Sequence, residues 1–200
     1  MCSIFTLSSH APYDQPMKDV LTKGRAENKY LNAAYYADRS IGEFMDKAGT
    51  RPWFKNTLFV FVADHAHPTH LHSDMFIAQH HHIPLLLYGE VIKPGYRGYF
   101  HEKMVQQHDL AATLLSRLHL PHKEFFWSRD VLNPYTQQWA YMSYSPDGFI
   151  WVHDGEEYSI DHFRNNEFHH NFISDSTKTP QLLKEGKSYM QEVFRQYLEM

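Results

Sequence analysis

The chain has 200 residues, of which 42% are hydrophobic and 16% aromatic, and it carries 19 Lys and Arg against 23 Asp and Glu. This composition suffices for one packed core and excludes intrinsic disorder, and the formal net charge of -4 removes the basic surface expected of a nucleic-acid-binding protein. No apolar run approaches the roughly 20 residues that span a bilayer, so we expect no membrane span and no secretion signal here. A single cysteine, Cys2, excludes an internal disulfide, whereas 16 histidines direct attention to metal or anion chemistry.

The first predicted elements alternate between strands and a helix. Residues 4–8 predict a short strand that ends before Pro12. Apolar residues recur at three- and four-residue steps over residues 28–48, which predicts an amphipathic helix that Gly49 terminates. Residues 57–63 form a continuous β-branched and aromatic run, which is typical of a parallel strand buried on both faces.

The same alternation continues before a change of pattern near the carboxyl end. Residues 83–88 predict a second buried strand, and residues 107–120 repeat the helical period. Residues 139–160 indicate a small antiparallel meander with turns at 146–148 and 154–155, and residues 179–200 a closing amphipathic helix.

This order predicts an α/β fold with a mainly parallel sheet and flanking helices. We expect one domain over residues 1–200, with the α/β part in residues 1–134 and the meander and closing helix in residues 135–200. No repeat or long linker divides the chain.

Two polar residues, Asp64 and His65, directly follow the strand predicted at residues 57–63. Ligands of α/β proteins bind at the carboxyl edge of the sheet, and carboxylate and imidazole are metal-binding groups, so this pair is a candidate metal site. An equally weighted interpretation is that Asp64 caps a turn and pairs with His65. The metal interpretation gains from the dense histidines of the next loop, most of which we expect to lie in solvent or behind the ligands: His67, His70, His72, His80, His81 and His82.

His10 also follows a predicted strand end and could face the same edge. The alternative is a turn histidine bonded to Ser8 or Ser9. His108, by contrast, precedes Asp109 at the start of a predicted helix, which favours a helix N-terminal role over metal binding.

Several segments together resemble a known family in sequence, order and spacing. They are residues 5–13, 30–38, 56–65, 82–89 and, for the following helix, 107–115. The chain resembles the carboxyl-terminal half of a sulfatase-like catalytic domain of the lipoteichoic acid synthase and phosphoethanolamine transferase group, within the alkaline phosphatase superfamily. Ala66 stands where that family usually has glycine.

The resemblance implies a phosphoryl or sulfuryl ester transferase or hydrolase that uses a divalent metal, Zn²⁺ or Mn²⁺ first and Mg²⁺ or Ca²⁺ as alternatives. By motif position it implies that Asp64 and His65 bind the metal and that His10 is a catalytic residue contacting the ester's anionic group or a second ion. A bound cation polarises an ester oxygen, and a histidine beside the leaving group can donate a proton.

The resemblance also implies an incomplete site, because the family's nucleophile and another acidic ligand lie in an amino-terminal half that has no counterpart among these residues. We therefore expect the chain alone to be inactive, and to need that half as a partner or to self-associate through an uncovered strand edge. The substrate would be a phosphate or sulfate ester, lipid-linked ones included, at the periplasmic or extracellular face of the cytoplasmic membrane. A different hypothesis is a non-catalytic metal-binding remnant or subunit that needs a partner chain.

Overall fold

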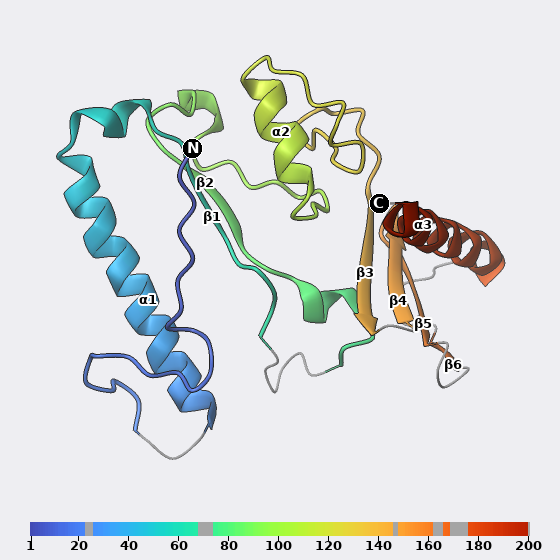
Figure 1. Ribbon diagram of the computed structural model, residues 1–200, viewed down its shortest axis with the longest axis horizontal. Helices are drawn as coiled ribbons and strands as arrows, with labels where there is room; N and C mark the ends of the chain where they lie inside the picture. Colours follow the sequence, from blue (N-terminus) through green and yellow to red (C-terminus); the bar gives the residue numbers. More distant parts are fainter. Residues whose placement is uncertain (23–25, 68–73, 146–147, 162–165, 169–175, 200) are drawn as a thin grey trace. The chain divides into compact units, whose positions relative to one another are not determined.

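The computed structural model describes residues 1–22, 26–67, 74–145, 148–161, 166–168 and 176–199 (Figure 1). The chain divides into two compact units, each described here by itself. We call them the ribbon unit, Met1–Val62 with Pro84–Arg97, and the meander unit, Ala63–Ile83 with Gly98–Met200. The two units do not follow the boundary between residues 134 and 135 that the sequence suggested for the α/β part and the meander. The expectation of a single domain over residues 1–200 stays a prediction.

The ribbon unit is built on one long helix. Helix α1, Ala26–Gly49, confirms the predicted amphipathic helix, and it carries Glu27 in its first turn and Lys47 in its last, as the helix dipole favours. Asn32 is buried on this helix, and its side-chain oxygen accepts hydrogen bonds from the backbone N–H groups of Val20 and Leu21 at 3.0 and 2.8 Å. The segment before α1 is thereby anchored on the helix.

Strands β1, Phe59–Val62, and β2, Leu85–Tyr88, form a two-stranded antiparallel sheet in the same unit. The expected parallel strands buried on both faces are therefore wrong for this pair, and every strand pairing in the described residues is antiparallel. The physical reason is that the chain returns along β1 itself, and an apolar run does not specify the direction of its neighbour. No residue of either strand is fully buried.

The strand predicted at residues 4–8 is also absent from the structure. These residues have no regular secondary structure, and Phe5 and Leu7 are 90% and 79% exposed. A strand needs a neighbour for its backbone hydrogen bonds, and the two described strands of this unit pair only with each other.

The meander unit contains the second sheet, whose strand order is β3–β4–β5–β6. Its strands confirm the predicted meander and add a fourth member: β3 Trp139–Ser145, β4 Gly148–His153, β5 Glu156–Asp161 and β6 Asn166–Phe168. Asp154 and Gly155 both have positive φ, 49° and 81°, as a two-residue hairpin between β4 and β5 requires. Part of the other predicted turn, residues 146 and 147, lies outside the described residues.

Two helices complete this unit. Helix α2, Asp109–Arg117, is shorter than the predicted helix, and α3, Thr179–Glu199, confirms the closing helix. Short 3-10 helices occur in the two units at Pro52–Asn56, Ala78–His81, Pro94–Tyr96 and Ser176–Lys178. In the parts of the chain that are described, no helix combines the length and apolar character of a membrane span.

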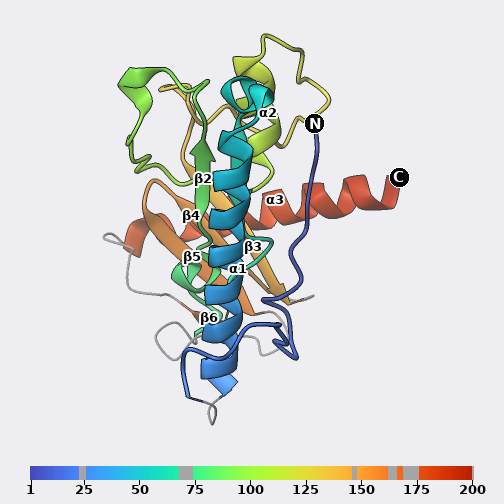
Figure 2. The same ribbon diagram turned by 90° about the vertical axis from the view of Figure 1, so that its left-hand side faces the viewer.

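Both faces of the β3–β6 sheet are covered within the meander unit. Helix α3 lies against β4 and β5 (Figure 1 and Figure 2), where Leu182 packs with Phe149 and Tyr158. On the other face, Ala78 packs with Ile150, and its backbone N–H donates to the Glu157 carboxylate at 2.8 Å. The centre of this sheet is therefore the main buried core among the described residues.

Candidate active site

The Asp64–His65 pair follows β1 after one intervening residue, Ala63, and its side chains are 71% and 74% exposed. Asp64 Oδ1 accepts a hydrogen bond from the His65 backbone N–H at 2.9 Å, and His65 Nδ1 lies 2.8 Å from the Ala66 carbonyl oxygen. The remaining atoms, Asp64 Oδ2 and His65 Nε2, lie 3.7 Å apart. Each side chain thus has one atom held by the backbone and one atom facing its partner, an arrangement that also fits the turn-capping interpretation.

His10 lies in a turn of the ribbon unit. Its backbone N–H donates to the Leu7 carbonyl at 3.0 Å, and its Nδ1 lies 2.7 Å from the Ala11 carbonyl oxygen. His10 therefore lies in a turn, as the alternative interpretation expects, but its ring contacts the Ala11 carbonyl oxygen, and the bond to Ser8 or Ser9 stays a prediction. Because His10 belongs to the ribbon unit and the Asp64–His65 pair to the meander unit, a site shared by the three remains a prediction.

His10 and His65 share one local arrangement. In both, Nδ1 is within hydrogen-bond distance of the carbonyl oxygen of the following alanine. A carbonyl oxygen is only an acceptor, so this contact favours the tautomer that carries its proton on Nδ1. The lone pair of Nε2 is then available for a cation, or for a proton that it can pass on.

The donor atoms of Asp64 and His65 suit a divalent cation. Zinc binds carboxylate oxygen and imidazole nitrogen at about 2.0–2.2 Å, so two ligands of one ion lie no more than about 4 Å apart. The 3.7 Å between Asp64 Oδ2 and His65 Nε2 is within that limit. Within the described ranges no group of three or more His, Cys, Asp or Glu side chains could hold a metal, so the pair supplies only part of a coordination sphere.

The histidine-rich loop is described in part. His70 and His72 lie outside the described residues, whereas His80 and His81 lie in the 3-10 helix Ala78–His81, where their rings pack edge to face at 5.0 Å. His81 Nε2 also lies 3.0 Å from the Met75 carbonyl oxygen, and burial lowers the pKa of this imidazole although that contact opposes the shift. His81 is therefore engaged within its own loop.

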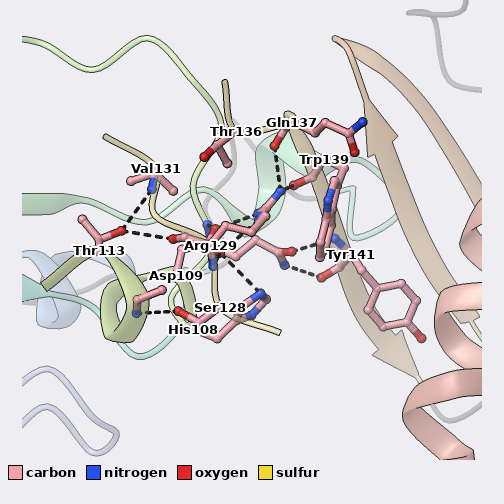
Figure 3. Close-up of polar contacts among 12 residues, drawn as sticks. His108, Asp109, Thr113, Ser128, Arg129, Val131, Thr136, Gln137, Trp139 and Tyr141 are labelled. Carbon is pink, nitrogen blue, oxygen red and sulfur yellow. Dashed lines mark hydrogen bonds and ion pairs between the residues drawn. The ribbon is translucent and has the colours of Figure 1, made fainter. Parts of the chain in front are cut away.

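A buried ion pair fixes the start of α2 (Figure 3). Asp109 is fully buried, and its carboxylate accepts hydrogen bonds from Arg129 Nε at 3.0 Å and Nη2 at 2.6 Å. The Arg129 guanidinium also donates to the Trp139 carbonyl oxygen at 2.9 Å, and its central carbon lies 3.8 Å from the centre of the Trp139 indole ring. The pair thus joins α2 to β3, and sequence reasoning missed it, because nothing in the sequence identifies a charge partner twenty residues away.

His108 is the residue directly before α2, which confirms the predicted helix N-terminal position. Burial lowers the pKa of its imidazole, and the nearby Arg129 charge acts in the same direction, although Asp109 opposes both. A neutral His108 suits its place beside the Trp139 ring, with ring centres 6.3 Å apart.

Two neighbouring glutamines, also missed in the sequence, make different connections. Gln106 donates to the Tyr141 carbonyl at 2.6 Å and accepts from the Tyr141 N–H at 3.1 Å. Gln107 Nε2 donates to the carbonyl oxygens of Ala63 and, at 3.1 Å, Asp64. The backbone of the candidate site is therefore tied to the residue two positions before α2.

Comparison with known proteins defines the class. The structure is similar to the crystal structure of a protein in the alkaline phosphatase superfamily from Vibrio parahaemolyticus, with a TM-score of 0.67 and 25% sequence identity. The match covers 86% of this chain and 41% of that chain, so this chain spans less than half of the Vibrio protein's length.

The family follows from the sequence itself. The sulfatase family model matches residues 1–120, more than half of the chain, and the chain belongs to the sulfatase family. Members of this family act on sulfate or phosphate esters, and members of the superfamily generally use divalent metals.

Proposed function

We propose that the chain forms the metal-binding part of a phosphoryl or sulfuryl ester transferase or hydrolase of the lipoteichoic acid synthase and phosphoethanolamine transferase type. The observation that carries the proposal is the pairing of Asp64 Oδ2 with His65 Nε2 at 3.7 Å in a sulfatase-family chain. Both atoms belong to side chains that are 71% and 74% exposed and whose other polar atom already contacts the backbone, which supports their use as metal ligands.

In this proposal Asp64 and His65 hold a divalent ion, Zn²⁺ or Mn²⁺ by the chemistry of the two donors. When bound, that ion would stabilise negative charge on the ester oxygen. His10 would contact the anionic group of the ester through Nε2, because its Nδ1 contacts the Ala11 carbonyl, or, when Nε2 is also protonated, donate that proton to the leaving oxygen.

The nucleophile and the remaining metal ligands would come from a further segment, corresponding to part of the length that the Vibrio protein has beyond the match. Transfer through a covalent intermediate needs that nucleophile, so we propose that turnover requires the two parts together. We also propose that the enzyme acts on the outer side of the cytoplasmic membrane, where lipid-linked phosphate esters are present.

The test is reconstitution. The purified chain is mixed with a separately expressed amino-terminal half of a sulfatase-like domain and assayed on p-nitrophenyl phosphate, bis(p-nitrophenyl) phosphate and p-nitrophenyl sulfate, with and without Zn²⁺ or Mn²⁺. We expect metal-dependent activity only in the mixture, and a loss on the order of 100-fold or more in Asp64→Ala and His65→Ala.

A matched control is Glu124→Ala, which removes an exposed carboxylate of the same unit and should leave the activity unchanged. Full activity of Asp64→Ala would contradict the proposal. Metal binding that depends on Asp64 without turnover in any pairing would favour the second candidate, a non-catalytic metal-binding subunit. That candidate draws on the histidine-rich stretch after Asp64, in which the His80 and His81 rings lie with their centres 5.0 Å apart.

A further inference from the structure

Gln106 and Gln107 are identical in chemistry and adjacent in sequence, yet they connect to different parts of the meander unit. Gln106 is partly buried, and its amide exchanges two hydrogen bonds with Tyr141 of β3. Its backbone N–H also donates to the buried Asp109 carboxylate at 2.9 Å. Gln106 thus belongs to the packing between α2 and the sheet.

Gln107 is exposed and has no part in that packing. Its Nε2 instead reaches back along the sequence to two successive carbonyl oxygens, those of Ala63 and Asp64. A side-chain amide has two N–H donors, so one glutamine can hold both carbonyls at once.

These two contacts fix the backbone that carries the metal-binding groups. The carbonyl of Asp64 and the N–H of His65 belong to the same peptide group, and each end of it is hydrogen-bonded: the carbonyl by Gln107 and the N–H by Asp64 Oδ1. The orientation of that peptide plane sets the directions in which both side chains leave the chain. Asp64 Oδ2 and His65 Nε2 come within 3.7 Å on this held plane.

We propose that Gln107 is a positioning residue for the Asp64–His65 pair: its side-chain amide holds the Ala63 and Asp64 carbonyls so that one carboxylate oxygen and one imidazole nitrogen face the same divalent cation. The inference rests on the metal site of the proposed function. Residues that hold metal ligands in place typically change metal affinity by roughly 10- to 100-fold when they are removed.

The experiment follows His65 itself, because the other 15 histidines would obscure a measurement of total metal binding. The full chain is labelled with ¹⁵N-histidine and titrated with Zn²⁺, and the His65 imidazole resonance gives the affinity at this position. We expect Gln107→Ala to lower this affinity by roughly tenfold or more, and Gln107→Glu, which keeps the size but places an acceptor against two carbonyls, to lower it as well.

A second readout needs no metal. Amide hydrogen exchange of the His65 N–H in the metal-free chain should accelerate by roughly tenfold in Gln107→Ala, because the peptide group loses the bond at its carbonyl end. Gln106→Ala is the matched control: it should lower the urea midpoint of unfolding and leave the His65 titration unchanged, whereas Gln107→Ala should keep the urea midpoint.

The outcomes separate this inference from the proposed function. A His65 response that Asp64→Ala removes and Gln107→Ala retains would overturn the positioning role and leave the metal site in place. A wild-type response equal to that of Asp64→Ala would overturn the metal site itself and the inference with it. Unchanged amide exchange in Gln107→Ala would overturn the positioning role whatever the metal does.

Discussion

The two units contain strands of similar apolar composition that differ sharply in burial. In β4 of the meander unit, Phe149 and Ile150 are both 0% exposed. In β2 of the ribbon unit, Leu85 and Leu86 are 38% and 54% exposed. The difference follows from neighbours: β4 pairs on both sides, and its two faces are covered by α3 and by the segment around Ala78, whereas β2 pairs only with β1.

This comparison shows that an apolar sequence sets the largest surface that a strand can bury. The neighbouring strands and helices determine how much of that surface is buried in the fold. The candidate metal pair also follows a strand with no fully buried residue, since Asp64 and His65 come shortly after β1. The candidate metal pair and the buried core of the sheet therefore lie in different stretches of the meander unit, and substitutions matched across the two units can test how burial differs between them.

The largest expected effect is the difference in lost stability between truncating a buried residue of β4 and truncating an exposed residue of β2. Ile150→Ala should cost about 2–5 kcal/mol in the free energy of unfolding, because it leaves a cavity on the sheet face against which Ala78 packs. Leu86→Ala should cost less than about 1 kcal/mol, since more than half of this side chain is already in solvent. Urea denaturation followed by circular dichroism measures both. Equal losses would mean that β2 is covered in solution, and a dependence on protein concentration would identify a second copy as the cover.

The next largest effect concerns two helical glycines, one in each unit. Substitution by alanine should change the free energy of unfolding in opposite directions at the two positions. A Cβ at Gly186 of α3 would lie 2.4 Å from Phe149 Cε2 and 3.0 Å from Trp151 Cβ, so the helix could not keep its approach to the sheet. Gly186→Ala should therefore cost about 1–3 kcal/mol of stability. A Cβ at Gly42 of α1 meets nothing within 4 Å, and Gly42→Ala should stabilise the chain by roughly 0.5–1 kcal/mol. Stabilisation at both positions would contradict the close packing of α3.

Much of this fold could be predicted because the signals are local. Helix α1 and helix α3 each repeat the apolar period over more than twenty residues, and the Asp154–Gly155 turn supports the hairpin of β4 and β5. The strand at residues 4–8 and the parallel direction of β1 were wrong, because both depend on a neighbouring strand that a sequence pattern does not identify.

The same division applies to the candidate site. Asp64 and His65 are adjacent in sequence, so their contact could be expected from the strand that precedes them. Gln107 lies more than forty residues from the carbonyls that it holds, and its exposed side chain has no pattern that distinguishes it from Gln106. Residues that bind can be recognised by their chemistry, whereas residues that orient them are defined by the fold.

The smallest effect concerns acid stability and the Glu185 carboxylate of α3. Burial opposes its ionisation, but hydrogen bonds from Gln181 at 2.9 Å, His153 at 2.7 Å and Trp151 at 3.1 Å outweigh burial and lower its pKa from the ordinary value of 4.5. A pKa that is lower in the folded than in the unfolded chain contributes stability above the unfolded value, and this stability is lost as the pH falls through the folded value.

Glu185→Gln should therefore flatten the fall in stability as the pH drops below the ordinary glutamate pKa of 4.5, and cost about 1 kcal/mol at neutral pH. The matched change in the ribbon unit is Glu43→Gln, which removes an ion pair with Arg39 whose side chains are 54% and 58% exposed. An exposed pair of this kind contributes about 0.5 kcal/mol or less, so this variant should follow the wild-type curve within that margin. Urea denaturation at a series of pH values measures both variants. If Glu185→Gln kept the wild-type acid slope, the hydrogen bonds between α3 and β4 would not be those that acid breaks, and the attachment of α3 to the sheet would rest on its apolar packing.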